Sequence, residues 1–271
     1  MLRGRERLPL EPATFLLTRK GFDLLKRHNR LAGYPILSDA VFDARSQVSP
    51  KTLEHELACL DVKVALVTAL SSRDDIQKVL CTTWPLMCQF RVRQPYASGY
   101  GASDTVVKPD GFCSFCQTDA DGIAEHYFFF EVDQGTEAQR VLIERAACYR
   151  AHFRNGSFAE SRGGTREEYE QYPFRVLAVF KTAERRNNAA ERLLSLNPPL
   201  MRMVWCSTMP EVLRDPLGPI WVQPADYQEV IAGSRHEIAS PRHLGRYRRQ
   251  KERDELVEEM VKKNRLVIVP T

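Results

Sequence analysis

Three carboxylates in two short strings could carry metal chemistry. Asp110 lies in Lys108-Pro109-Asp110, and the other two lie in Glu131-Val132-Asp133. Carboxylate oxygens are the ligands that Mg²⁺ or Mn²⁺ prefers, and these ions keep bound waters for reaction. In phosphodiester hydrolysis the metal would polarise the phosphate and lower the pKa of the attacking water. Lys108 would then stabilise the negative charge that develops.

A β-hairpin must bring the two strings together. Its predicted arms are residues 104–117 and 124–133, joined by a turn at residues 118–122 that contains Asp-Gly, a strong hairpin signal. A two-residue loop at 120–121 places Asp110 opposite Glu131 and Lys108 opposite Asp133. A loop at 121–122 instead places Asp110 opposite Asp133. Because side chains alternate along a strand, the three acids share a face in either register.

Two explanations of this acidic face stay open. Like charges facing each other destabilise a sheet, so either a divalent cation or a buried Lys or Arg must neutralise them. Alternatively, the acids are surface residues, and Lys108 and Asp133 form an exposed cross-strand pair of little energetic worth. The second arm contains Phe128, Phe129, Phe130 and Val132, which indicates a central strand where unpaired acids are costly.

Other groupings of metal-binding residues give weaker signals. Cys113 and Cys116 form a Cys-x-x-Cys in a strand, where positions three apart point to opposite faces, so zinc binding there is improbable. His55 and Cys59 lie one helical turn apart, which is typical of a helix face near the core. Neither a nucleophile-elbow sequence nor a phosphate-binding Gly loop is present.

The surrounding pattern predicts an α/β or α+β fold with a mixed central sheet flanked by helices. Thr18 is a predicted N-cap for a helix over residues 19–29, and Ser49-Pro50 predicts the start of a long amphipathic helix. A near-continuous apolar run at residues 174–180 predicts a buried central strand. Further helices are expected at residues 136–153, 183–196 and 244–263, and further strands at 86–92, 201–206 and 220–222.

Composition is that of an ordinary globular protein. The chain has 271 residues, of which 43% are hydrophobic and 27% charged, with a net charge of +4. The absence of a long apolar run and of a signal-peptide pattern predicts a cytosolic location. The seven cysteines are an odd number, which favours reduced thiols over a disulfide framework.

The strongest concentration of positive charge lies near the C-terminus. This stretch could follow a phosphate backbone, or it could be a solvated helix face, because several acids follow it. Its residues proposed to contact nucleic acid are Arg246, Arg248, Arg249 and Lys251.

Several strings together resemble one family. Residues 15–21 (FLLTRKG) resemble the wing strand and "LTxxG" entry of a winged helix, and residues 53–57 (LEHEL) an "l-x-H-x-L" helix. Residues 108–111 (KPDG) resemble an "r/k-P-D-g" strand, and residues 129–137 (FFEVDQGTE) closely match "f-x-E-v/l-D-r-G-T-E". Arg145 and Tyr149 stand where a "K-x-x-x-Y" helix is found. Over about residues 13–180 the chain resembles the replication-relaxation family of bacterial plasmids and integrative elements.

That resemblance implies a partial winged helix with a linker (residues 1–48) and a domain similar to PD-(D/E)xK nucleases (49–233). The charge pattern adds a basic C-terminal helix and tail (234–271). The chain begins at the expected wing, so we expect that the recognition helix of the winged helix is missing or that the start of the sequence is truncated. The resemblance also implies that Asp110 and Glu131 bind Mg²⁺ or Mn²⁺. Asp133 stands where an active nuclease has Lys, so Lys108 or another cation would have to replace that charge while Asp133 orients water.

The functional hypothesis that follows is a DNA-associated protein of a mobile element, acting in plasmid replication or mobilisation. As a metal-dependent nuclease, it would use Arg145 to contact a phosphate. The alternative is a non-catalytic module with an inactivated nuclease fold, which binds DNA, a relaxase or a replication protein.

Overall fold

The computed structural model describes residues 17–32, 39–46, 49–83, 88–93, 104–135, 139–228, 255, 258–259 and 265–269. The chain divides into two compact units, Met1–Ser49 and Pro50–Thr271. The candidate site lies entirely in the second unit.

The first unit contains two helices, α1 (Arg19–Arg27) and α2 (Asp39–Ser46). The predicted cap is confirmed, because the Thr18 side chain accepts a hydrogen bond from the Gly21 N–H. The rings of Phe22 and Phe42 stack with centroids 4.4 Å apart and hold the two helices together. Residues 15 and 16 of the predicted wing strand lie outside the described residues, so the winged helix stays a prediction.

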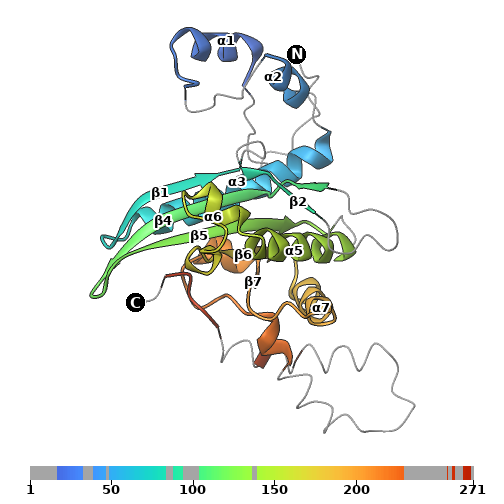
Figure 1. The fold of residues 1–271 in the computed structure, drawn as a ribbon. Helices are drawn as coiled ribbons and strands as arrows, with labels where there is room; N and C mark the ends of the chain where they lie inside the picture. The colour runs from blue at the N-terminus through green and yellow to red at the C-terminus, as the bar shows by residue number, and fades with distance from the viewer. Residues whose placement is uncertain are drawn as a thin grey trace. The chain divides into compact units, whose positions relative to one another are not determined.

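A five-stranded mixed sheet forms the centre of the second unit (Figure 1). Its order is β1-β4-β5-β6-β7. Strands β1 (Ile76–Thr82), β4 (Gly111–Asp119) and β5 (Gly122–Asp133) are antiparallel neighbours. Strands β6 (Arg175–Phe180) and β7 (Val204–Thr208) continue the sheet in parallel with β5. The predicted α/β class, the central strand β6 and the flanking helices are confirmed.

The hairpin adopts the first of the two registers considered. Asp119 pairs with Gly122, so Ala120 and Asp121 form the loop, and Asp119 Oδ1 accepts hydrogen bonds from the N–H groups of Asp121 and Gly122. The predicted first arm is wrong in its extent. Strand β3 (Asp104–Val107) leaves the hairpin and pairs with β2 (Phe90–Arg93) in a separate two-stranded sheet. Pro109 has no N–H to donate to a ladder, which favours a break at this point.

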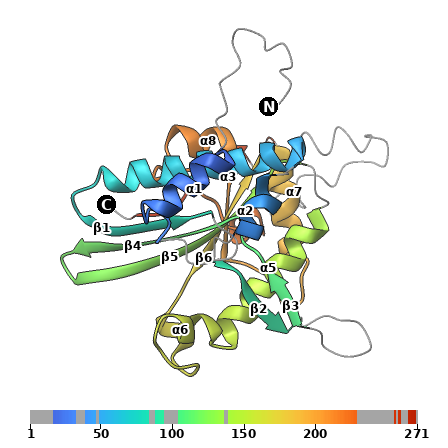
Figure 2. The same cartoon turned by 90° about the horizontal axis from the view of Figure 1, so that it is seen from above.

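Helices cover both faces of the five-stranded sheet (Figure 2). On one face, α3 (Pro50–Ser71) and α8 (Met209–Arg214) pack with the even-numbered side chains of β5, including Phe128 and Phe130. On the other face, Phe129 packs with α5 (Gln139–Arg154), α6 (Ser157–Ser161) and α7 (Ala183–Leu194). A short 3₁₀ helix, η1 (Tyr169–Gln171), precedes β6. The alternation along β5 therefore directs neighbouring residues into two separate cores.

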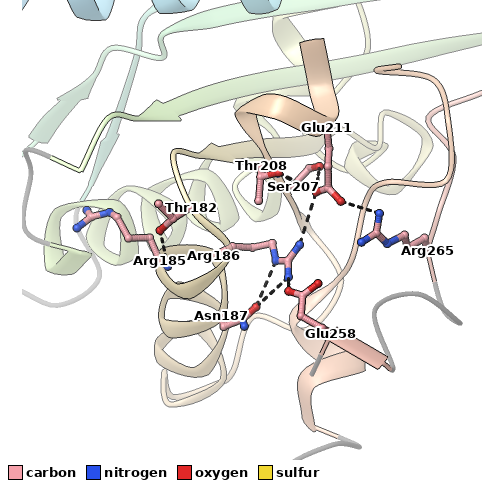
Figure 3. A network of polar contacts seen from close by, with 9 residues as sticks. All are labelled: Thr182, Arg185, Arg186, Asn187, Ser207, Thr208, Glu211, Glu258 and Arg265. Atoms are coloured by element: carbon pink, nitrogen blue, oxygen red, sulfur yellow. Dashed lines mark hydrogen bonds and ion pairs between the residues drawn. The ribbon is translucent and has the colours of Figure 1, made fainter. Parts of the chain in front are cut away.

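The C-terminal residues that are described pack against this core. Leu266 pairs with Trp221, and Ile268 and Val269 are buried. Figure 3 shows a polar network centred on the buried Arg186 of α7. The Arg186 guanidinium bonds Asn187 and Glu258 and lies 3.6 Å from Glu211, whose other oxygen accepts from Arg265 at 2.6 Å.

Most of the predicted basic helix at residues 244–263 lies outside the described residues, including Arg246, Arg248, Arg249 and Lys251. In the part of the chain that the structure describes, no helix has the length and apolar character needed to cross a membrane.

Candidate functional site

Asp110 lies just before β4, at the point where that strand separates from β5. Its Oδ2 accepts a hydrogen bond of 2.7 Å from the Val132 N–H, so the carboxylate continues the ladder that β4 no longer supplies. Its Oδ1 lies 2.9 Å from Nε2 of His55, on α3. The Asp110 side chain is 14% exposed. Both of its oxygens therefore have partners within the fold.

Glu131 is a buried carboxylate near the end of β5, only 2% exposed. Arg145 donates to its Oε2 and Tyr149 to its Oε1, each at 2.6 Å. The two donors lie one turn apart on α5, and so reach the carboxylate from the same helix face. Burial raises the pKa of Glu131 to about 7, with the negative charge of Asp110 as a second cause, against the opposing effects of Arg145 and Tyr149. The pKa of Tyr149 is likewise raised, by burial and then by Glu131.

Asp133 ends β5 beside Phe180, the last residue of β6. Arg185, from the first turn of α7, donates to it with Nε at 2.7 Å and a second nitrogen at 2.9 Å. The Gly135 N–H donates a third bond at 2.9 Å. Thr182 caps this helix and so fixes where its first turn begins. The result is a bidentate ion pair with good geometry.

The predicted pairing of Lys108 with Asp133 is wrong. Lys108 is exposed and precedes β4, whose ladder with β5 begins at Gly111 opposite Phe130. The prediction missed Arg185 because it is 52 residues away in sequence. One signal could have found it: parallel strands end at the same edge of a sheet, so the helix after β6 starts next to the end of β5.

The structure thus neutralises the acidic residues with protein groups. For Glu131 and Asp133 the opposite charge comes from an Arg side chain, which is one of the explanations that the sequence left open. Hard cations need carboxylate oxygens that are free to coordinate them. Since the Arg145 guanidinium already bonds Glu131 at 2.6 Å, Mg²⁺ or Mn²⁺ held between Asp110 and Glu131 would have to compete with that positive charge.

A second set of groups converges on Asp110 from α3. Besides its contact with Asp110, Nε2 of His55 lies 3.6 Å from Sγ of Cys59. The ligand atoms of His55, Cys59 and Asp110 all lie within 4.8 Å of one another. Within the described ranges, this is the one cluster of three or more His, Cys, Asp and Glu residues with that spacing, and it includes neither Cys113 nor Cys116. The sequence showed the i, i+4 spacing of His55 and Cys59 but not their proximity to Asp110.

A family model described as "Replication-relaxation" matches residues 3–167, more than half of the chain. No curated protein and no solved structure matches this chain.

Proposed function

Because the chain belongs to the replication-relaxation family, we propose that it acts on DNA in the replication or mobilisation of a plasmid or other mobile element. We propose further that it does so as a binding module with a nuclease-like core that does not cleave DNA. Its partners would be DNA and a relaxase or replication protein. Family membership supports the first part, and the geometry around the three carboxylates supports the second.

The main support for a non-catalytic role is that the Glu131 carboxylate is buried and already bonded to protein groups. Arg145 and Tyr149 use both of its oxygens, and burial excludes water from it. A metal at this position would have to displace a short charge-assisted hydrogen bond, one of the stronger interactions available to a carboxylate. Asp133 is held by Arg185, and among the described residues it forms no ion pair with a lysine. The cluster therefore has the character of a structural ion-pair network.

The positions of the acidic residues in the sheet support a relationship to nucleases. Pro109-Asp110 directly precedes β4, and Glu131-Val132-Asp133 ends the neighbouring β5, within a mixed sheet flanked by helices. These are the places that the resemblance assigns to the acidic residues of a PD-(D/E)xK core. The proposed core would keep this arrangement while Arg145 takes the place of the cation.

The proposed DNA contacts come from the basic stretch near the C-terminus. Arg145 bonds Glu131 and its side chain is 31% exposed, so it is a poorer candidate for a phosphate contact than the sequence suggested. The net charge of +4 and the positions Arg246, Arg248, Arg249 and Lys251 favour a polyanionic partner.

Fluorescence anisotropy with a labelled duplex tests this proposal. Binding should weaken steeply with salt, by about tenfold or more between roughly 50 and 200 mM, and should be the same in Mg²⁺ and in EDTA. Reversing the charges of Arg246, Arg248 and Arg249 to Glu should reduce the affinity. The matched control reverses Arg91, Arg93 and Arg140, exposed residues of β2 and α5. An equal loss in both triple variants, or no binding by the wild type at low salt, contradicts the proposal.

One observation favours a metal-dependent nuclease as the second candidate. The charge of Asp110 raises the pKa of Glu131, so the two carboxylates are close enough to repel each other. A divalent cation would relieve that repulsion if Arg145 moved away. This candidate requires Mn²⁺- or Mg²⁺-dependent nicking of DNA that disappears in Asp110→Ala and Glu131→Ala.

A further inference from the structure

We propose that His55, Cys59 and Asp110 form a binding site for a divalent transition metal of the zinc class. The three side chains come from two parts of the fold. His55 and Cys59 lie one turn apart on α3, and Asp110 lies directly before β4. Oδ1 of Asp110 and Sγ of Cys59 approach the same atom, Nε2 of His55, at 2.9 and 3.6 Å.

The spacing is close to that of a tetrahedral site. Zinc binds His nitrogen at about 2.0–2.1 Å, carboxylate oxygen at about 2.0–2.2 Å and Cys sulfur at about 2.3 Å. Two such ligands on one tetrahedral ion then lie about 3.3–3.7 Å apart. The separation of His55 and Cys59 already falls in this range, and Asp110 needs to withdraw from His55 by only a few tenths of an ångström.

The donor set selects the class of metal. A nitrogen, a sulfur and an oxygen ligand suit zinc, cobalt and similar ions, whereas Mg²⁺ prefers oxygen ligands alone. This choice separates the proposed site from the Mg²⁺ site expected from the sequence, with which it shares only Asp110. Three protein ligands leave the fourth position of the ion for water.

The surroundings hold the ligands and leave a path to them. The Val132 N–H bonds Oδ2 of Asp110 and so orients Oδ1 toward His55. At the neighbouring Gly111, the ring of Phe130 packs so closely that a Cβ would lie 2.0 Å from it. Cys59 is buried at 4% exposure, whereas the His55 side chain is 37% exposed and open to solvent. An ion can therefore enter past His55 and reach a thiol that lies inside the fold.

Cobalt titration of the metal-stripped full-length protein tests the site. We expect one equivalent of Co²⁺ to bind with the visible absorption of a tetrahedral ion and a near-ultraviolet thiolate-to-cobalt charge-transfer band. Cys59→Ser should remove the charge-transfer band. His55→Gln and Asp110→Asn should each weaken the affinity by about tenfold or more. Zinc should displace the cobalt, and native mass spectrometry should show a single bound ion.

Cys88→Ser is the matched control, because Cys88 is a buried thiol that lies 3.6 Å from the Pro109 carbonyl oxygen, next to Asp110. It should leave the spectrum unchanged. Absence of Co²⁺ and Zn²⁺ binding by the folded wild type would overturn the proposal, as would loss of the thiolate band in Cys88→Ser but not in Cys59→Ser. His55→Gln changes a half-exposed residue and keeps the test decisive if Cys59→Ser folds poorly. The readout needs no DNA, so it is independent of the proposed function.

Discussion

Replacing Arg145 by Ala should destabilise the protein in a way that depends on pH. The substitution removes the donor that bonds Glu131 at 2.6 Å, and Glu131 is 2% exposed. Removing one partner of a buried ion pair costs about 3–5 kcal/mol. Because the Arg145 side chain is 31% exposed and water reaches part of it, we expect the lower end, about 3 kcal/mol, where Glu131 is ionised.

The pH dependence follows from the raised pKa of Glu131, about 7 in the folded protein. In the unfolded chain this carboxyl has a pKa near 4.3, so the folded state binds more protons in between. Stability is therefore highest below the unfolded pKa and falls as pH rises through the folded pKa. Loss of Arg145 raises the folded pKa further and so extends this fall to higher pH. At about pH 5.5 a protonated Glu131 needs no counter-charge, so the cost should shrink to about 1 kcal/mol, that of a neutral hydrogen bond.

Urea denaturation at about pH 5.5 and pH 8.5 measures both values. The control is Arg140→Ala on the same helix, where an 81% exposed Arg pairs with Glu144 and should contribute less than about 0.5 kcal/mol at either pH. A Glu131→Gln/Arg145→Ala double variant removes the charge and should lose most of the pH dependence. Equal destabilisation at the two pH values, or an Arg145→Ala effect as small as that of Arg140→Ala, would refute the reasoning.

Three further predictions concern the surrounding fold. Gly111→Ala should lower stability by about 1–3 kcal/mol, because its Cβ would meet the Phe130 ring at 2.0 Å. An unchanged urea midpoint would mean that β4 and β5 separate easily at this point. Burial lowers the pKa of His152, stacked 4.0 Å from Phe90, to about 4, so stability should fall by up to about 3 kcal/mol as pH drops from about 6.5 to 4. His152→Phe should reduce that slope in pH-dependent denaturation, and an identical slope would contradict the assignment. Arg186→Met should cost about 3 kcal/mol because Glu211 and Glu258 lose a buried cation, and wild-type thermal stability in that variant would show that the network contributes little.

The sequence predicted those parts of the fold that depend on local pattern. The Asp-Gly turn identified the hairpin, and the apolar runs identified β5 and β6. Strand β1 was missed because it is an edge strand with a single buried residue and an irregularity at Lys78, where φ is +52°. The break before β4 was missed because the alternation continues through residues 104–107 although their partner is β2.

Of the candidate site, only the acidic residues could be predicted from the sequence. Glu131 and Asp133 lie where the hairpin required, but their cations depend on how helices pack after the sheet forms. Arg145 is 14 residues from Glu131, and Arg185 is 52 from Asp133. Helical periodicity placed His55 and Cys59 on one face, yet nothing local connects that face with Asp110, 55 positions from His55. Such contacts require the tertiary arrangement.

We propose that the carboxylate cluster is a closed ion-pair network in a protein that binds DNA without cutting it. Incubation with supercoiled plasmid in Mg²⁺, Mn²⁺ or EDTA, followed by gels run before and after removal of protein, tests this most directly. We predict a shifted complex in all three conditions and fully supercoiled plasmid after deproteinisation. Nicked or linear product that requires the metal, and that disappears in Glu131→Ala, would contradict the account.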